Sequence, residues 1–219
     1  MPTSGLLYVY SKIICPTLSP ARFAQRYEEV HIPDIFKTSG IKTAYHYLTA
    51  SLSPEAIDRP YLALYPLEDL HSLRTDDLKG IPVHHDILPG TKAIFDVAEF
   101  DTRYYAHVQT FETDGAKPGA ANLVISADFT PAEGGENDFD PWYRQEHLHK
   151  LAKCPGYRQT RRSEKKRLLE PPMFLALHEF EGKGLKQLGK SVAETVTGTT
   201  GDTADDSRRV LKKRKEDEP

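Results

Sequence analysis

The stretch FDPWYRQEHLHKLAKCPG, residues 139–156, decides how this chain is organised, because a related stretch lies earlier in the sequence. When the sequence is shifted by 116 positions, four pairs of identical residues coincide: Phe23 with Phe139, Tyr27 with Tyr143, His31 with His147, and Gly40 with Gly156. Such self-similarity at one fixed offset is typical of an internal repeat.

Two further blocks extend the repeat on either side. Upstream, LYVYSKI (residues 7–13) matches LVISADF (residues 123–129) at the same offset. Downstream, YLALYPLE (residues 61–68) matches FLALHEFE (residues 174–181) after a deletion of three residues. Three matched blocks in the same order predict a tandem duplication.

Each copy predicts the same succession of elements. The first block alternates and is rich in Val, Ile, Tyr and Phe, which favours a half-buried strand. A helix follows, with Ser19 as N-cap and Pro20 as first helical residue in copy one. Its face repeats every four residues: Phe23, Tyr27, His31 and Ile35 in copy one, and Phe139, Tyr143, His147 and Leu151 in copy two. Second strands at 43–49 and 157–163 precede the third block.

These residues resemble the EthD-like family. The likeness rests on an aromatic pair, a helix with Glu-His, a leucine, and Pro-Gly before a strand: Trp142, Tyr143, Glu146, His147, Leu151, Pro155 and Gly156. It is good over residues 121–181 and looser over 6–68, where Arg26 replaces the tryptophan and Val30 replaces the glutamate. The resemblance implies the dimeric α/β-barrel superfamily of ferredoxin-like βαββαβ units. It also implies that a degenerate site would be the first one.

The predicted fold is therefore α+β, with two tandem ferredoxin-like βαββαβ units whose antiparallel sheets pack face to face as an α/β barrel. Residues 1–116 form the first EthD-like repeat, 117–213 the second, and 214–219 a disordered tail. The remaining second helices are expected at 67–79 and 185–195, and the fourth strands near 104–109 and at 208–212. Residues 81–90, 114–120 and 131–141 are expected to be loops.

Composition narrows the function class. The net charge is −3 with both signs interspersed, so no field favours a nucleic-acid partner. The longest apolar runs have strand length and Lys12 interrupts the first, which argues against a membrane span or a signal peptide. Cys15 and Cys154 are not in equivalent positions, so we expect free thiols and a cytoplasmic protein. A monomer or a homodimer fits the expected burial of the sheets.

The candidate site follows from the helix face that should be apolar. Two polar tips on a buried face must find partners or line a cavity, and both copies carry Tyr and His there. The candidate catalytic residues are His147, Tyr143 and His31, and the candidate substrate-binding residues are Tyr27, Trp142, His178 and Phe139. A core histidine bonded to a carbonyl is the simpler alternative. The weaker candidates are His46, His107 and the pair His84 and His85. His147 and His149 have poor spacing for a metal on a helix, so no metal site is expected.

The resemblance implies a small hydrophobic, polyketide-like or aromatic substrate and acid–base chemistry without a cofactor, of the lyase, cyclase or decarboxylase type. An imidazole suits this role because its unperturbed pKa is near 6.5. His147 would move the proton and Tyr143 would steady an oxyanion. The alternatives are a non-catalytic ligand-binding or stress-response barrel and a cofactor-free monooxygenase, since fold alone does not fix function.

Overall fold

The computed structural model describes residues 2–49, 58–114, 119–131, 135–165, 174–181 and 207–213. The chain divides into two compact units, residues 1–106 and 107–219, and each carries its own antiparallel strands and helices. The division falls inside one strand, whereas the sequence repeat places its boundary at 116; that boundary remains a prediction. Within the described ranges, no helix combines the length and the apolarity needed to cross a membrane.

Unit 1 contains a four-stranded antiparallel sheet in the order β4-β1-β3-β2. Its strands are β1 (Gly5–Ile13), β2 (Tyr45–Thr49), β3 (Tyr61–Leu67) and the first part of β4 (Ala98–Glu112). Because side chains alternate along a strand, Leu7 and Val9 pack into the core under the helices while Tyr8 and Tyr10 occupy the other face. All four are buried, so neither face of β1 is open to solvent.

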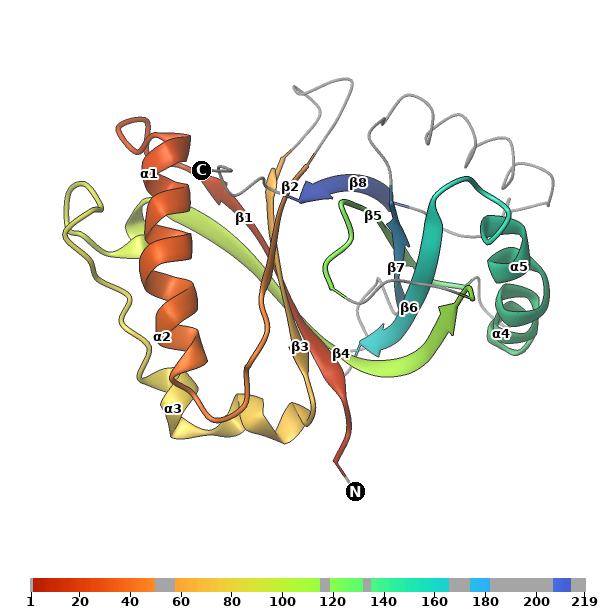
Figure 1. The fold of residues 1–219 in the computed structure, drawn as a ribbon. Helices are drawn as coiled ribbons and strands as arrows, with labels where there is room; N and C mark the ends of the chain where they lie inside the picture. The colour runs from red at the N-terminus through yellow and green to blue at the C-terminus, as the bar shows by residue number, and fades with distance from the viewer. Residues whose placement is uncertain are drawn as a thin grey trace. The chain divides into compact units, whose positions relative to one another are not determined.

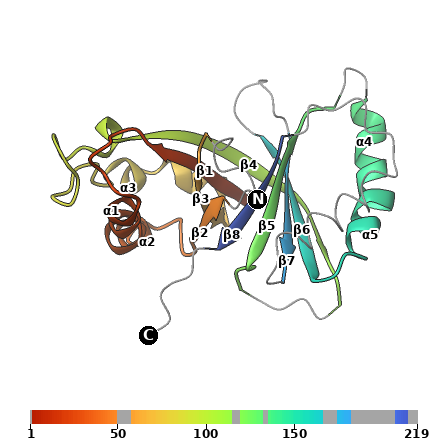
Figure 2. The ribbon, with the colours of Figure 1, turned by 90° about the horizontal axis from the view of Figure 1, so that it is seen from above.

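The long helix of unit 1 begins as the sequence predicts. Ser19 accepts a hydrogen bond from the backbone N–H of Arg22, and Pro20 is the first residue of α1 (Pro20–Gln25). The helix continues through a π-helical turn, η1 (Arg26–His31), into α2 (Ile32–Phe36). Figure 2 shows α1 and α2 on one side of the unit 1 strands. The buried stripe is Phe23, Tyr27 and Ile35.

The second helix of unit 1 is shorter than expected. Residues 67–79 form two pieces, the 3-10 helix η3 (Leu70–Arg74) and α3 (Asp76–Lys79), with Thr75 extended between them. Asp69 caps η3 by accepting a hydrogen bond from the His71 N–H. Residues 81–90 are loop as predicted, and a short 3-10 turn, η4 (Ile94–Asp96), leads into β4. The capping aspartate explains why the helix begins three residues late.

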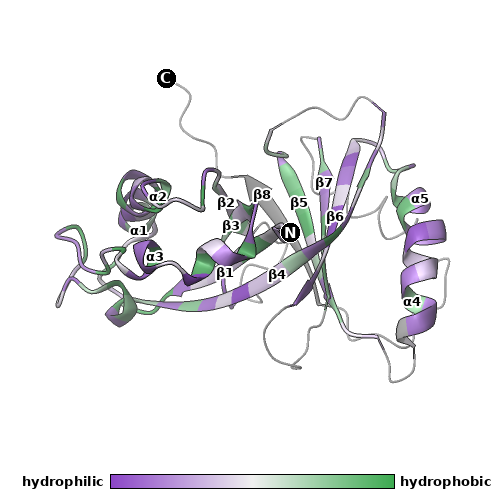
Figure 3. Cartoon of the chain, turned by 90° about the horizontal axis from the view of Figure 1, so that it is seen from below, coloured by the Kyte–Doolittle hydropathy of each residue, from purple (hydrophilic) through white to green (hydrophobic). Residues whose placement is uncertain are grey.

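Unit 2 has the strand order β8-β5-β7-β6, again antiparallel. Its strands are β5 (Leu123–Phe129), β6 (Tyr157–Lys165), β7 (Phe174–Phe180) and β8 (Ser207–Lys213). The end of β4 joins β6, because the Thr113 N–H donates to the Arg158 carbonyl at 3.1 Å. In Figure 3, β5 is largely hydrophobic whereas α4 is largely hydrophilic. The fourth strand of unit 2, β8, includes residues 208–212, where the repeat predicts a strand.

The helix of unit 2 starts earlier than the sequence suggests. Residues 131–141 are expected to be loop, but α4 (Glu136–Trp142) already begins at Glu136 and contains Pro141. It continues through the π-helical turn η5 (Tyr143–His147) into α5 (Leu148–Leu151), and Figure 1 shows the segments in succession. Gly156 follows with a φ of 80°, which suits glycine at a helix end. The expected helix at 185–195 and the tail at 214–219 lie outside the described residues.

The two units share one connectivity and one strand order, that of a ferredoxin-like fold over the elements described. The strand registers also correspond: His46 pairs with Ala63 in unit 1, and Arg162 pairs with Ala176 in unit 2. His46 and Arg162 are 116 positions apart, the offset of the sequence repeat. This agreement is what a duplication would produce, although the duplication itself and the face-to-face packing of the sheets stay predictions.

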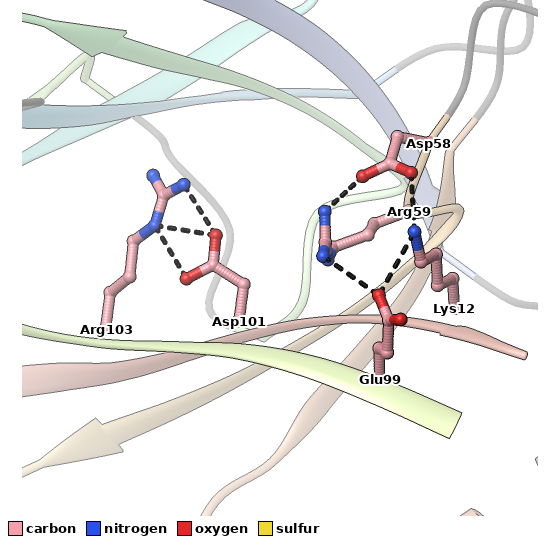
Figure 4. A network of polar contacts seen from close by, with 6 residues as sticks. All are labelled: Lys12, Asp58, Arg59, Glu99, Asp101 and Arg103. Atoms are coloured by element: carbon pink, nitrogen blue, oxygen red, sulfur yellow. Dashed lines mark hydrogen bonds and ion pairs between the residues drawn. The ribbon is translucent and has the colours of Figure 1, made fainter. Parts of the chain in front are cut away.

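An ion-pair network ties the strand ends of unit 1 together (Figure 4). Lys12 on β1 contacts Asp58 at 2.9 Å and Glu99 at 3.1 Å, and Arg59 contacts the same two carboxylates. Lys12 and Glu99 are cross-strand partners in the register of β1 and β4. The charges balance and the carboxylates are half exposed, so the network has a modest structural role.

Candidate functional site

In both units the candidate tyrosine and histidine lie on a π-helical turn. The N–H of Ile32 bonds the Tyr27 carbonyl in η1, and the N–H of Leu148 bonds the Tyr143 carbonyl in η5, five residues apart in each case. In this wider turn, two residues four positions apart lie more nearly on the same side of the helix. The rings of the tyrosine and the histidine therefore stay in contact. The centroids are 4.9 Å apart for Tyr27 and His31, and 4.7 Å apart for Tyr143 and His147. Single π turns in α-helices are frequent at functional sites.

A chain of hydrogen bonds runs from the helix into the sheet of unit 2. The Tyr143 hydroxyl lies 3.2 Å from Nε2 of His178 on β7, and Nδ1 of His178 lies 2.8 Å from Oγ1 of Thr160 on β6. Thr160 Oγ1 is 2.7 Å from the Tyr157 hydroxyl, which donates to the Phe111 carbonyl at 3.5 Å. This series of hydrogen bonds thus links the helix to strands β7, β6 and β4 through buried polar atoms.

The last acceptor determines which atom is the donor in each of these hydrogen bonds. The Phe111 carbonyl only accepts, and burial raises the pKa of Tyr157 to about 12, so Tyr157 keeps its proton and donates. Thr160 then donates to Tyr157, and Nδ1 of His178 donates to Thr160. Nε2 of His178 is left to accept from Tyr143 when the ring is neutral, or to donate to it when the ring is protonated.

His147 lies beside this chain, on the turn that carries Tyr143. It is 8% exposed, and its ring centroid is 4.9 Å from Trp142 and 5.9 Å from His178. Glu146, next in sequence, faces solvent and pairs with Lys150 at 3.5 Å. Two imidazoles at this separation repel when both are charged, which disfavours the state with a proton on each ring.

Arg162 completes the site from β6. Its side chain is 2% exposed, and its guanidinium carbon lies 5.0 Å from the centre of the Tyr143 ring. Nη2 contacts the carboxylate of Asp140, which also accepts from Arg144 Nε at 2.7 Å. Its cross-strand partner is Ala176, whose small side chain leaves room for the arginine between sheet and helix. A buried cation over a phenol ring favours negative charge nearby.

One side of the site consists of aromatic rings that reach the surface. Phe139, Trp142 and Phe174 are half-buried, and Phe129 beneath them is buried. Neighbouring rings in this group lie 4.8 to 6.0 Å apart, and Phe139 is 5.5 Å from Tyr143. Rings that are part exposed and part buried suit contact with a flat apolar ligand.

The equivalent place in unit 1 has different chemistry. The Tyr27 hydroxyl is 2.9 Å from the Tyr65 hydroxyl, because Tyr65 stands where unit 2 has His178. His46 stacks on Tyr27 at 4.9 Å, where unit 2 has Arg162, and its Nδ1 lies 3.0 Å from Glu28. Burial raises the pKa of Tyr27 to about 12 and that of Tyr65 well above its usual range.

Unit 1 also covers its own aromatic rings. Phe23, the counterpart of half-buried Phe139, is 0% exposed, and Leu88, Ile94 and Val97 of the segment 81–97 pack into the same core. Arg26 is buried and donates from Nη2 to the Pro82 carbonyl at 3.0 Å. Burial lowers the pKa of His31 to about 4, so this imidazole is neutral at neutral pH. The described part of unit 1 offers Nδ1 of His31 no hydrogen-bond partner.

The structure gathers the candidates of each copy around one tyrosine. Tyr143, His147, Trp142, Phe139 and His178 lie together in unit 2, and Tyr27 and His31 lie together in unit 1. Of the weaker candidates, His46 belongs to the unit 1 group. His107 forms a hydrogen bond with Thr110, and His84 pairs with Ala93 through the backbone. The catalytic and substrate-binding roles of these residues stay predictions.

The polar residues that β6 contributes to the unit 2 site escaped the sequence reasoning. Thr160 and Arg162 lie two apart on β6 and share the face of the sheet that meets the helix, and Tyr157 begins that strand. The repeat offset could have pointed to Arg162 through His46, although a basic residue on a strand normally suggests a solvent-facing position. Among the described residues, no group of three metal-binding side chains is close enough to hold a metal ion.

Comparison with known proteins places the fold. No family model matches the chain. Core atranone cluster protein 1 of Stachybotrys chlorohalonatus is 25% identical over 222 residues, covering 89% of this chain and 92% of that protein.

Solved structures agree on the architecture. An anthrone oxidase-like protein aligns with a TM-score of 0.57 at 13% identity, covering 98% of this chain and 92% of that one. A protein described as a monooxygenase of Fusobacterium nucleatum gives 0.61 at 12% identity, covering 98% and 94%. A chlorite dismutase variant of Candidatus Nitrospira defluvii gives 0.63 at 9% identity, covering 98% and 92%. The units of the chain therefore have the ferredoxin-like fold, and the EthD-like assignment stays a resemblance.

Proposed function

We propose that this chain is an acid–base enzyme of secondary metabolism, which enolises a small polyketide-like or aromatic substrate in unit 2 without a bound cofactor. The observation that carries the proposal is the buried chain from Tyr143 through His178 and Thr160 to Tyr157, with His147 beside it. The likeness to a protein of the core atranone cluster supports the metabolic setting.

In the proposed reaction, His147 takes a proton from a carbon next to a carbonyl group of the substrate. The electron pair of that C–H bond moves toward the carbonyl oxygen, which becomes an enolate or phenolate. Tyr143 donates its hydroxyl hydrogen to this oxygen, one helical turn from His147. Proton transfer by a positioned side chain contributes ~10²–10⁴ in rate.

His178 decides whether Tyr143 can donate. With a neutral His178 ring, the Tyr143 hydrogen is bound to Nε2; with a protonated ring, Nε2 donates to the Tyr143 oxygen and releases that hydrogen toward the substrate. The active form therefore has a charged His178 and a neutral His147. The repulsion between the two rings, whose centroids are 5.9 Å apart, disfavours a proton on His147 once His178 is charged.

The fate of the enolate defines the reaction type. Protonation at another carbon, ring closure, or loss of a carboxylate or leaving group would make the enzyme an isomerase, cyclase, decarboxylase or lyase. A second candidate is oxygenation, which the likeness to an anthrone oxidase-like protein and to a described monooxygenase favours. In that reaction, dioxygen takes the electrons of the carbanion, one oxygen atom enters the carbon as a new carbonyl, and the other leaves as water.

Deuterium exchange tests enolisation without knowledge of the natural product. Anthrone is incubated with the protein in D₂O under nitrogen, and NMR follows the loss of its methylene protons. We expect exchange above the buffer rate with wild type and with His31→Gln, and a loss of ~10²–10⁴ of the catalysed part with His147→Gln. Equal exchange rates with and without protein would contradict the proposal for this substrate class.

The same mixtures opened to air separate the two candidate functions. Oxygen uptake with formation of anthraquinone, dependent on His147, would assign the oxygenase. Exchange without oxygen uptake would assign the non-oxidative enzyme. A binding protein differs from both, because His147→Gln would then change the affinity for anthrone and there would be no turnover to lose.

A further inference from the structure

Arg162 is a buried cation that its surroundings satisfy only in part. Its Nη2 pairs with Asp140, but Nε and Nη1 are buried and have no hydrogen-bond partner among the residues that the structure describes. A guanidinium group cannot give up its charge at any ordinary pH, although burial lowers the pKa of this one. Leaving charged donors unpaired away from water costs more than leaving neutral donors unpaired.

The carboxylate that pairs with Arg162 is shared. Asp140 contacts Arg162 and also accepts from Arg144 Nε at 2.7 Å, so two guanidinium groups meet this one carboxylate. Glu146, which follows on the same helix, pairs instead with Lys150.

We propose that Arg162 is the anion-binding residue of the unit 2 site and takes a carboxylate group of an aromatic substrate through its unpaired Nε or Nη1. These two nitrogens lie on different edges of the planar guanidinium, and each edge also contains Nη2, so a bound carboxylate would share Nη2 with Asp140 or displace it. The proposal rests on the proposed function and adds to it the class of substrate, an aromatic acid.

The position of Arg162 fits such a substrate. Its guanidinium carbon lies 5.0 Å from the centre of the Tyr143 ring, and Tyr143 contacts Phe139, Trp142 and His147. An aromatic body in place among the half-buried rings of Phe139, Trp142 and Phe174 would thus set its acid group near the arginine. Withdrawal from water strengthens the ion pair.

The test compares two probes of equal shape. Anthraquinone-2-carboxylate and anthraquinone-2-carboxamide differ in charge but not in ring system. Trp142 is the only tryptophan of the chain, so quenching of its fluorescence reports binding at this site. We expect the wild-type protein to bind the carboxylate ~10- to 100-fold more tightly than the carboxamide, the range for a hydrogen bond to a charged group.

Three variants separate recognition from structure. Arg162→Gln should bind both probes with the affinity of the carboxamide, and Arg162→Lys should keep only part of the preference because it lacks the fork. Asp140→Asn should raise the affinity for the carboxylate at least threefold, because it removes the competing anion. A purely structural Arg162–Asp140 pair predicts instead that Asp140→Asn weakens both probes. Arg161→Gln, which removes a neighbouring guanidinium paired to Glu179, is the matched control.

Each result is decisive. Equal wild-type affinities for the two probes, or an unchanged preference in Arg162→Gln, would overturn the anion role and assign these nitrogens to water, while the proposed function would stand. Absence of any quenching by either probe would contradict the site itself and so both proposals. If Arg162→Gln does not fold, Arg162→Lys and Asp140→Asn decide by the same criteria.

Discussion

At the scale of single residues, the two histidines of the repeat have different surroundings. His147 faces Trp142, Tyr143 and His178, whereas His31 lies beside Arg26. Burial lowers the pKa of His31, and the positive charge of Arg26 lowers it further. Tyr27 bonds another tyrosine, and both keep their protons at neutral pH. The sequence repeat alone makes the two histidines look equivalent, and their partners separate them.

The first prediction concerns these two residues. His147→Gln should reduce the catalysed exchange of anthrone by ~10²–10⁴, because the proton acceptor is lost. His31→Gln should change it less than threefold. The measurement is the exchange rate at saturating protein, with circular dichroism to confirm that both variants fold. Equal losses would show that both units are active.

The second prediction concerns stability and pH. Burial lowers the pKa of His31 to about 4 from an unfolded value near 6.5, so the unfolded chain binds the extra proton first as the pH falls. This residue therefore lowers the free energy of unfolding progressively between pH 6.5 and pH 4, by up to about 3 kcal/mol at 1.36 kcal/mol per pKa unit. Above pH 6.5 it has no effect.

Urea unfolding from pH 4 to pH 8 checks this prediction. His31→Gln should flatten the pH dependence in that window. His85→Gln, in the loop 81–90, is the control and should leave it unchanged. If the free energy of unfolding depends on pH as strongly in His31→Gln as in the wild type, other groups cause that dependence. One such group is His107, because burial also lowers the pKa of His107.

At the scale of elements, the π turns are the feature that ordinary helix periodicity does not reveal. A spacing of four places Tyr and His on one side of an α-helix, but the hydrogen bonds of η1 and η5 span five residues. The sequence shows no signal for this widening. It recurs at nearly equivalent positions of the two units, which indicates that the sequence repeat carries it.

The third prediction follows from the π turn. Deleting Gln145, which is exposed in η5, should return the turn to α-helical bonding and rotate His147 relative to Tyr143. We expect the exchange activity to fall as far as in His147→Gln while the far-ultraviolet circular dichroism is kept. Deleting Glu29, the exposed residue at the matching place in η1, is the control and should leave activity unchanged. Full activity after deletion of Gln145 would show that the wide turn has no role in catalysis.

Strands were more predictable than helix boundaries. The alternating blocks at 7–13, 61–68, 123–129 and 174–181 correspond to β1, β3, β5 and β7, since alternation is a local property of the sequence. The late start of η3 depends on the capping by Asp69, and the early start of α4 places Pro141 inside a helix. Both depend on local competition that a hydrophobic pattern does not record. Arg162 was missed for a similar reason, because its burial requires Asp140 from a distant helix.

At the scale of the whole molecule, the likeness of the two units contrasts with the difference in their surfaces. Both have the strand order of a ferredoxin-like unit, and His46 and Arg162 hold the same place on the central tyrosine. The resemblance to the EthD-like family predicted this strand order, and the three blocks that repeat in order predicted that both units would have it. It did not show that residues 81–97 cover the aromatic rings of unit 1, since those contacts are long-range.

The fourth prediction concerns stoichiometry. Unit 1 buries Phe23 completely and fills the matching space with Leu88, Ile94 and Val97, whereas unit 2 leaves Phe139 and Trp142 half-buried. We therefore expect one molecule of anthraquinone-2-carboxylate bound per chain, measured by isothermal titration calorimetry, with binding lost in a Tyr143→Ala variant and kept in Tyr27→Phe. Replacing Leu88 by alanine removes part of this cover, and should still give one site because His46 takes the place of Arg162 and the guanidinium of Arg26 donates to the Pro82 carbonyl. Two equivalent sites in the wild-type protein would mean that the cover over unit 1 opens in solution, and that the two units have a common function.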